Sequence, residues 1–156
     1  MEIVIEHAQP EHASIVPYLR AADVEEIHAS TGLPAAAAVA YSIAVSKAYS
    51  VLLDERPVVI FGVGPNAPKN GRTDGRTGEI WLVGTEEIEK RPVMFYRVSK
   101  RLFPMVCDGY SDLVNFVDAR NILSLRWLEW LGFDIGEAKS FGVYGLPFHF
   151  VRWRRI

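Results

Sequence analysis

A glycine-rich stretch is the first candidate for chemistry in this sequence. Residues Gly62 to Ala67 match the letters of the dinucleotide-binding fingerprint and follow a predicted strand. Pro65 and Pro68 interrupt the stretch, so no helix begins there to present its N-terminus to a pyrophosphate. The sequence also lacks a phosphate loop that ends in Gly-Lys-Ser/Thr. Neither of these nucleotide-binding motifs is therefore predicted.

Metal binding and nucleophilic catalysis have equally little support. The histidines His7, His12, His28 and His149 show no metal-ligand spacing, so no metal site is predicted. Cys107 is the only cysteine and has no base near it in the sequence, which favours a structural thiol. A single cysteine also excludes an intramolecular disulfide and a cysteine-rich zinc site.

The composition is typical of one soluble globular domain. The 156 residues (17.5 kDa) are 49% apolar and 23% charged, and 8 Phe, 6 Tyr and 4 Trp are available for a core. The longest apolar stretch, residues 33–45, is too short to span a membrane. The first residues lack the basic region of a secretory signal, so we expect a protein that is not secreted.

Charge is distributed unevenly along the chain, although it sums to only −2. Residues 1–30 hold six acids and one base, whereas residues 90–156 hold eleven bases and six acids. We expect anionic ligands to favour the C-terminal half, unless the charges mix on folding. Three arginines in the tail 152–155 fit a solvated chain end better than a nucleic-acid contact.

Apolar periodicity and turn residues predict the elements of the first half. Short helices are predicted between residues 10 and 30. The Gly- and Pro-rich segment 64–78 is predicted to be a mobile loop within a single domain that spans residues 1–156. The other predicted elements are a strand over Glu2–His7, a helix over Ala35–Ala48 and a hairpin of Tyr49–Leu53 with Val58–Val63.

The elements of the second half are those that would position a site. A helix opened by Pro92, which Pro104 kinks or ends, separates two predicted strands, Glu79–Thr85 and Asp112–Val117. The order predicts a mixed α/β (α+β) fold whose successive strand–helix–strand crossovers make the middle of the sheet parallel. The remaining elements are a helix over Asn121–Leu131 closed by Gly132, and strands over Phe133–Tyr144 and Phe148–Trp153.

The segment 115–133 carries one specific pattern, Asn-x-x-Ala/Ser-x-x-Leu-Tyr-x-x-x-Gly-Phe. The chain fits it in register, with tryptophan and leucine at the Leu-Tyr pair, at Asn121, Ser124, Trp127, Leu128, Gly132 and Phe133. In this it resembles the strand-to-helix segment of the GNAT superfamily of N-acetyltransferases. The resemblance implies the GNAT fold, a central mixed sheet with a parallel wedge flanked by helices.

Within that superfamily the segment resembles small GNAT-like internal virion proteins of short-tailed bacteriophages. The likeness is carried by Asn115, Val117, Asn121 and residues 125–128, with Arg126 as part of it. It implies a location in the host cytoplasm or the virion, with virion or host proteins as partners.

The superfamily resemblance implies an acetyl-CoA site in the wedge between Glu79–Thr85 and Asp112–Val117. Backbone groups near Leu82 and Val83 would bind the pantetheine arm and polarise the thioester carbonyl. Glu79 would be the catalytic base, the alternative being a solvated strand end. The other implied cofactor contacts are Gly84, Lys90, Arg91, Asn121 and Ser124, with Arg97, Lys100 and Arg101 near a 3′-phosphate.

Asn121 can also serve a purely structural role, as a helix cap, that needs no cofactor. It precedes the apolar stripe of its helix and can accept a hydrogen bond from the backbone N–H of residue 123 or 124. Capping alone is the favoured prediction. On that reading, Asn121→Ser costs only a few tenths of a kcal/mol.

Two departures from the GNAT pattern weaken the expectation of catalysis. Glu86, Glu87 and Glu89 would face an anionic pyrophosphate, unless they simply stabilise the start of the next helix. Leu128 stands where the family has the tyrosine that protonates the leaving thiolate. The candidates to replace that tyrosine are Tyr96, Tyr110 and Tyr144.

Two hypotheses of different classes follow. The favoured one is a GNAT-like virion or host-interaction protein without strong catalysis. The alternative is an acetyl-CoA-dependent N-acetyltransferase that acts on a primary amine of a small molecule or a protein. An open wedge-shaped cleft would favour the enzyme. The first hypothesis would be favoured by an exposed aromatic patch of Trp127, Trp130, Phe148 and Trp153.

Overall fold

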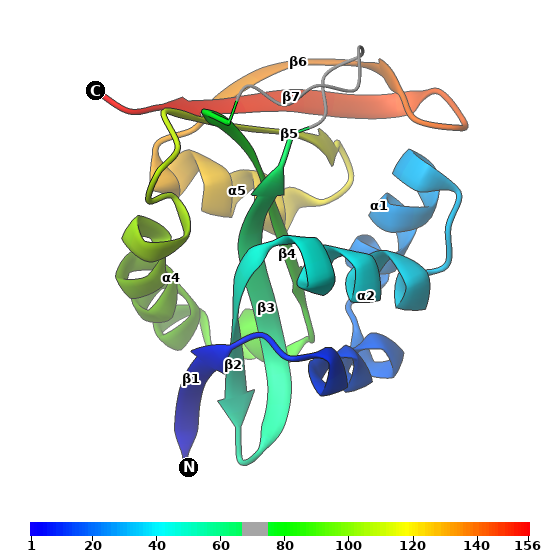
Figure 1. The fold of residues 1–156 in the computed structure, drawn as a ribbon. Helices are drawn as coiled ribbons and strands as arrows, with labels where there is room; N and C mark the ends of the chain where they lie inside the picture. The colour runs from blue at the N-terminus through cyan, green and yellow to red at the C-terminus, as the bar shows by residue number, and fades with distance from the viewer. Residues whose placement is uncertain (67–74) are drawn as a thin grey trace.

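The computed structural model describes residues 1–66 and 75–156, which form a seven-stranded sheet with helices on both faces (Figure 1). The strand order is β1-β2-β3-β4-β5-β7-β6, and in the described part of the chain only β4 and β5 pair in parallel. The strands are β1 (Ile3–His7), β2 (Lys47–Leu53), β3 (Arg56–Pro65), β4 (Thr77–Gly84), β5 (Asp112–Asp118), β6 (Asp134–Phe141) and β7 (Leu146–Arg154). The helices are η1 (Pro10–Tyr18), α1 (Ala21–Thr31), α2 (Ala35–Val45), α3 (Glu87–Lys90), α4 (Pro92–Val106) and α5 (Ile122–Leu131). The mixed fold predicted from the sequence is confirmed.

The predicted hairpin is formed by β2 and β3. Its two turn residues, Asp54 and Glu55, have φ angles of 47° and 71°, as a two-residue turn between twisted strands requires. The strand β3 continues to Pro65 and β4 begins at Thr77, so the segment 64–78 is shorter as a loop than predicted. The predicted mobility concerns its middle, residues 67–74, which lie outside the described residues.

Two predicted helix ends are wrong. The helix predicted to reach Ala48 ends at Val45, because Ala48 pairs with Gly62 in the sheet. A Cβ at Gly62 would lie 2.6 Å from that of Ala48, so the glycine is what lets the two strands meet. Pro104 does not end its helix, since α4 runs on to Val106 and a proline in the last turn removes a single N–H donor.

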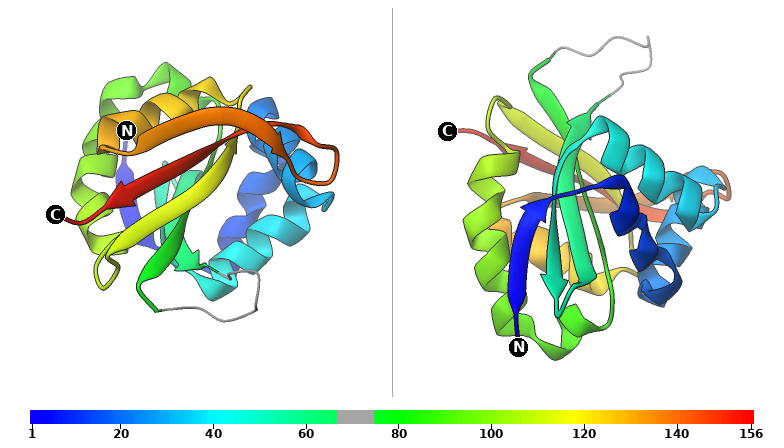
Figure 2. Two further views of the ribbon diagram at one scale, coloured as in Figure 1. Left: turned by 90° about the horizontal axis from the view of Figure 1, so that it is seen from above. Right: turned by 60° about the horizontal axis from the view of Figure 1, so that its bottom comes forward.

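The end of the sheet differs from the predicted pair of parallel crossovers. The last strand, β7, lies between β5 and β6 and is antiparallel to both (Figure 2). The hairpin of β6 and β7 folds back, so that β7 rather than β6 pairs with β5 along the length of that strand. Of the two predicted crossovers, only the one from β4 to β5 therefore joins neighbouring strands.

Two apolar cores hold the helices to the sheet. One face is covered by α4 and α5, whose Phe95, Leu102 and Trp127 pack against the strands. The other face is covered by η1 and α2, through Ile15 and Val39. In the residues that the model describes, no helix combines the length and apolarity needed to cross a bilayer.

Candidate active site

The strands β4 and β5 diverge after their first residues. Their pairing ends at Glu79 opposite Val114. At the next position the Asn115 side chain donates from Nδ2 to the Ile80 carbonyl, and beyond it β5 pairs only with β7. The predicted adjacency and parallel direction of the two strands are confirmed, and the divergence opens a gap between their C-terminal halves.

A cavity of ≈250 Å³ lies at this divergence. Its walls come from β4 and β5, from α1 and α2 on one face of the sheet, and from α5 on the other. Four of the predicted site residues line it, namely Glu79, Leu82, Val83 and Ser124. The structure therefore contains the open cleft that would favour an enzyme.

The backbone of Leu82 is directed into the gap. Along β4, the Ile80 carbonyl is bonded by the Asn115 side chain, and both Gly84 backbone groups bond to the start of α1 rather than to β3. Leu82 lies midway between these two residues at the two-residue period of a strand, so its N–H and C=O point the same way. No side chain of the described residues hydrogen-bonds to either group. An N–H donor at this place is suited to a carbonyl oxygen that gains negative charge.

Glu79 lies on β4 at the mouth of the cavity. Its side chain is exposed and forms no hydrogen bond or ion pair with another described residue. Protein atoms around the carboxyl group partly exclude water from it, and this desolvation raises the pKa of Glu79 above its ordinary value. A carboxylate with a raised pKa that faces a cavity is suited to accept a proton.

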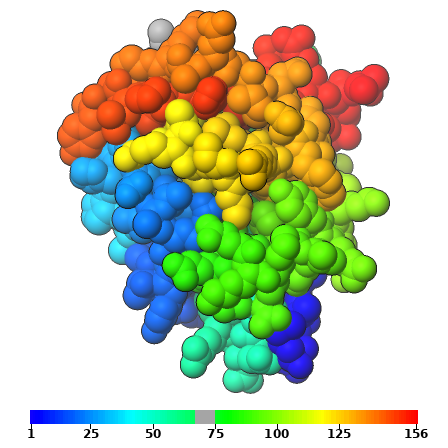
Figure 3. Space-filling view, turned by 180° about the vertical axis from the view of Figure 1, so that it is seen from behind, coloured from blue at the N-terminus to red at the C-terminus, as the bar shows by residue number. Residues whose placement is uncertain are grey.

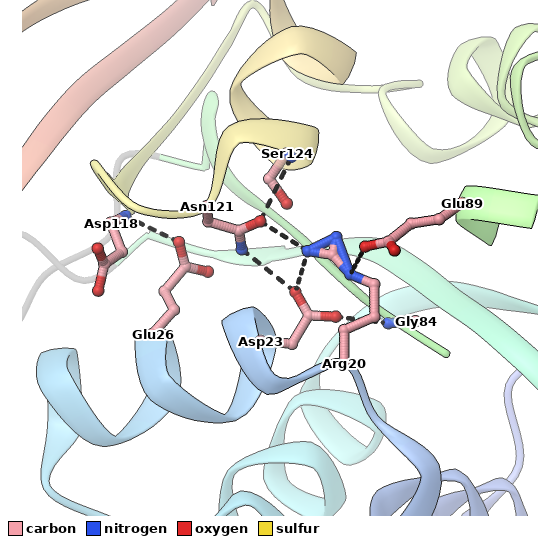
Figure 4. Close-up of polar contacts among 8 residues, drawn as sticks. All are labelled: Arg20, Asp23, Glu26, Gly84, Glu89, Asp118, Asn121 and Ser124. Atoms are coloured by element: carbon pink, nitrogen blue, oxygen red, sulfur yellow. Dashed lines mark hydrogen bonds and ion pairs between the residues drawn. The ribbon is translucent and has the colours of Figure 1, made fainter. Parts of the chain in front are cut away.

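A buried polar network closes the far end of the gap (Figure 4). Arg20 Nη2 donates to Asn121 Oδ1 (2.7 Å) and to Asp23 Oδ1 (3.3 Å). Asp23 Oδ2 accepts from the Gly84 N–H (2.9 Å), and Asn121 Nδ2 donates to Asp23 Oδ1 (3.2 Å). Arg20, Asp23 and Asn121 are each 3% exposed or less. The start of α1 therefore occupies the edge of β4 that β5 leaves free.

Glu26 lies one turn further along α1 and binds the other strand. Its Oε1 accepts from the Asp118 N–H (2.8 Å) at the end of β5. Removal from water, with the nearby carboxylates of Asp23 and Asp118 in addition, raises the pKa of Glu26 to about 8. Since Glu26 also lines the cavity, a mostly protonated carboxylic acid faces the cleft at neutral pH.

Gly84 is placed differently from what the sequence suggested, whereas Asn121 forms the predicted cap and has further partners. Gly84 was expected to offer a free backbone to a phosphate, but its N–H donates to Asp23 and its C=O accepts from the Arg20 N–H (2.9 Å). A Cβ at Gly84 would lie 2.7 Å from Ile88 Cδ1, so close packing explains this glycine. Asn121 does cap α5, accepting from the Ser124 N–H, and in addition binds the network. Whether either residue contacts a cofactor stays a prediction.

Two of the three acids that follow β4 form ion pairs within the protein. Glu87 forms ion pairs with Arg91 (3.0 Å) and Lys90 (3.9 Å), and Glu89 lies 3.5 Å from Arg20 Nε. Lys90 and Arg91, both predicted to bind the cofactor, therefore already have a carboxylate partner.

A second hollow of ≈330 Å³ lies between α4 and α5. The Tyr96 and Trp130 rings meet edge to face in it at 4.7 Å, and Arg97 and Lys100 flank them. Arg97 and Lys100 are exposed, so this groove combines aromatic surface with two accessible cations. It places together two of the three cations that the sequence had suggested for a 3′-phosphate.

None of the tyrosines suggested as the acid lines the cavity between the strands. Tyr96 packs on Trp130, Tyr110 lies beside Gly78, and the Tyr144 hydroxyl is 3.2 Å from His28 Nε2. Leu128 does line the cavity. Among the described residues, the proton for a leaving group in this cavity therefore has to come from a group other than these three tyrosines.

Arg20, Asp23 and Glu26 were missed as site residues at the level of sequence. Their partners Asn121, Gly84 and Asp118 are remote in the chain, so no local pattern connects them. One signal existed, because Arg20 is the only Lys or Arg among the first 30 residues and is followed by acids at intervals of three, which place all three side chains on one helix face. From behind, α1 in blue and the start of α5 in yellow meet beside the green segment of α3 (Figure 3).

Asn121→Ser should cost about 2 kcal/mol of unfolding free energy, well above the few tenths expected for exchange of one cap for another. Serine keeps an oxygen for the Ser124 N–H but is too short to reach both Arg20 and Asp23. Urea unfolding of both proteins measures the difference. A loss of only a few tenths of a kcal/mol of unfolding free energy would mean that Asn121 acts only as a cap and that its hydrogen bonds to Arg20 and Asp23 contribute nothing.

Glu26→Gln should make stability less dependent on pH. The folded-state pKa of Glu26 is raised to about 8 from 4.5, so the native protein loses stability as the pH rises between these values, because only the unfolded chain releases this proton. Glutamine accepts the Asp118 N–H without ionising. Relative to the wild type, the variant should gain on the order of 2–4 kcal/mol between pH 5 and pH 8. Glu25→Gln, at an exposed neighbour, is the control, and equal pH profiles for both variants would contradict the assignment.

Comparison with known proteins identifies the fold. No protein-family model and no curated protein matches the sequence. An N-acetyltransferase from Staphylococcus aureus Mu50 superposes with a TM-score of 0.70 at 14% identity over 99% of each chain. A GNAT-family acetyltransferase from Streptococcus pneumoniae gives 0.69 at 14% identity, over 99% of this chain and 100% of that one. An aminoglycoside acetyltransferase in complex with coenzyme A superposes with a TM-score of 0.67 at 15% identity, over 99% of this chain and 95% of that one. The chain therefore has the fold of GNAT acetyltransferases.

Proposed function

We propose that this protein is an acetyl-CoA-dependent N-acetyltransferase that acts on a primary amine. The observation that carries the proposal is the divergence of β4 from β5. It directs the Leu82 N–H into a cavity whose mouth holds the Glu79 carboxyl. A CoA thioester as donor is supported by the shared fold, since one structure of that fold contains coenzyme A.

Each of three residues of the cleft has a separate role in the proposed reaction. Acetyl-CoA supplies the acyl group as a thioester. Glu79 takes one proton from the acceptor's ammonium group, and the freed amine nitrogen bonds to the acyl carbon as the carbon–sulfur bond breaks. The nitrogen then loses a second proton to solvent, which leaves the neutral amide. The Leu82 N–H stabilises the negative charge on the carbonyl oxygen. Glu26, protonated at neutral pH, returns a proton to the leaving thiolate in place of the tyrosine that Leu128 replaces.

The cleft fits coenzyme A in part. Leu82 offers its backbone to the pantetheine arm. The groove with Tyr96, Trp130, Arg97 and Lys100 has surface suited to a phosphorylated nucleotide, but it shares no lining residue with the cleft. Arg20 Nη1 is a buried donor without a partner among the described residues, but Arg20 does not line the cavity. Gly84, in contrast, is bonded to the start of α1.

A protein of this fold without catalysis is the second candidate function. Its specific support is the network of Arg20, Asp23 and Asn121, which occupies one end of the gap and both backbone groups of Gly84. The exposed aromatic patch that would have favoured it is not formed, because Trp127 and Phe148 are each 1% exposed. The proteins reported above carry no virion or phage role in their names, so a virion role has no support from them.

Titration calorimetry with acetyl-CoA, followed by thiol release in the presence of amines, tests the proposal. We expect saturable binding and amine-dependent release of the CoA thiol. Binding without amine-dependent release for any amine tried would favour the second candidate. The absence of binding at ~1 mM acetyl-CoA, with no rise in melting temperature, would overturn the proposal.

A further inference from the structure

We propose that the acceptor is a small primary amine with an aromatic body, which packs against Phe116 and Phe141 while its ammonium group meets Glu79. The proposal rests on the proposed function and names the class of substrate for the same cavity. It depends on the aromatic wall of the cavity, on the charge of the cavity, and on the position of Glu79 and Phe116 on the same face of the sheet.

The aromatic wall is formed at the outer side of the cavity by strands β5 and β6. The rings of Phe116 and Phe141 are nearly parallel, with an angle of 8° and a centroid distance of 4.0 Å, and both residues line the cavity. Phe116 is 39% exposed although it is a large apolar residue. Because each ring covers one face of the other, the pair offers the cavity its ring edges and the exposed part of Phe116, against which an aromatic group can pack edge to face.

Glu79 and Phe116 lie on the same face of the sheet. Glu79 is paired with Val114 in the parallel register, and Phe116 follows Val114 at the two-residue period of β5. Ile27 of α1 and Val39 of α2 complete the apolar surroundings on that face. A ligand that lies on Phe116 therefore has the Glu79 carboxyl on its own side of the sheet.

The cavity holds little other charge. Among the described residues no Lys or Arg lines it, and its two further acids already have partners within the protein. Asp23 is bonded to Arg20 and to the Gly84 N–H, and burial together with nearby carboxylates keeps Glu26 mostly protonated at neutral pH, since its pKa is about 8. One ionised carboxylate at the mouth suits a monocation, whereas a polycationic aminoglycoside would bring several ammonium groups to a cavity with one partner.

The reaction for this class is a simple acyl transfer. The amine nitrogen forms the new carbon–nitrogen bond, the thioester carbon–sulfur bond breaks, and the products are the N-acetyl amide and the free CoA thiol. One ammonium proton passes to Glu79, the nitrogen gives up a second proton to solvent as the amide forms, and the thiolate takes up one proton.

Thiol release with three amines, 2-phenylethylamine, ethylamine and kanamycin, tests the inference. We expect kcat/KM for 2-phenylethylamine to exceed that for ethylamine at least 30-fold, with kanamycin below both. Phe116→Ala should lower kcat/KM for 2-phenylethylamine about 10-fold more than kcat/KM for ethylamine. Phe150→Ala is the matched control, because Phe150 is 40% exposed and packs on Phe116 without lining the cavity.

The outcomes separate the two proposals. Acetyl-CoA binding with kanamycin or ethylamine as the better acceptor would overturn the aromatic-amine inference and leave the proposed function standing. Equal losses in Phe116→Ala and Phe150→Ala would also overturn it, because the effect would then not come from the cavity wall. Failure to bind acetyl-CoA would overturn the proposed function itself.

Discussion

Glu79→Gln should lower kcat/KM for amine acetylation by about 100-fold, the lower end of what general acid–base catalysis contributes. Glutamine keeps the size of the side chain and loses the ability to take a proton. The Kd for acetyl-CoA and the melting temperature should not change, because the Glu79 side chain is exposed and has no described partner. Initial rates with saturating acetyl-CoA measure the effect.

The pH profile provides a second readout for the same residue. In the wild type, kcat/KM should rise with pH as Glu79 ionises, with a midpoint above the ordinary pKa of 4.5, since the protein mass around the carboxyl raises its pKa. The Gln variant should lack this limb. Glu129→Gln, at an exposed position of α5, is the control. A Glu79→Gln enzyme with wild-type rates would show that another group accepts the proton.

Arg20→Met should cost 3–5 kcal/mol of unfolding free energy, a large part of the stability of a domain of this size. The substitution leaves the Asp23 carboxylate, which is 1% exposed, without its cation. Desolvation by burial already raises the pKa of Asp23 despite Arg20, so in the variant the group would take up a proton on folding. The loss should therefore be smaller at pH 5 than at pH 8, as measured by urea unfolding.

Two further variants separate the buried charge from a general effect of losing an arginine. Arg91→Met breaks an exposed ion pair with Glu87 and should cost no more than ~1 kcal/mol. Adding Asp23→Asn to Arg20→Met removes the unpaired charge and should restore part of the loss. Equal stability of Arg20→Met and Arg91→Met would show that the network does not hold the end of the gap closed.

The sequence by itself determined the parts of this protein that depend on near neighbours. The hairpin of β2 and β3, and the helix α5 between the Asn121 cap and the left-handed Gly132, follow from local hydrogen bonding and backbone preference, although the turn is two residues long and not the four expected. The parallel neighbours β4 and β5 followed from the crossover through α4. These predictions succeeded because each feature is encoded within a few residues or one connection.

Only the tertiary structure decided what closes the gap between those strands. Arg20 reaches Asn121 across 101 residues, and Asp23 reaches Gly84 across 61. Ala48 likewise lies in a strand because Gly62, which has no side chain, leaves room for it, and β7 rather than β6 pairs with β5. Each of these depends on which segments meet after folding. The energy of a buried charge or a close backbone approach depends on its surroundings in space, and those surroundings are not present in the residues on either side of it in the chain.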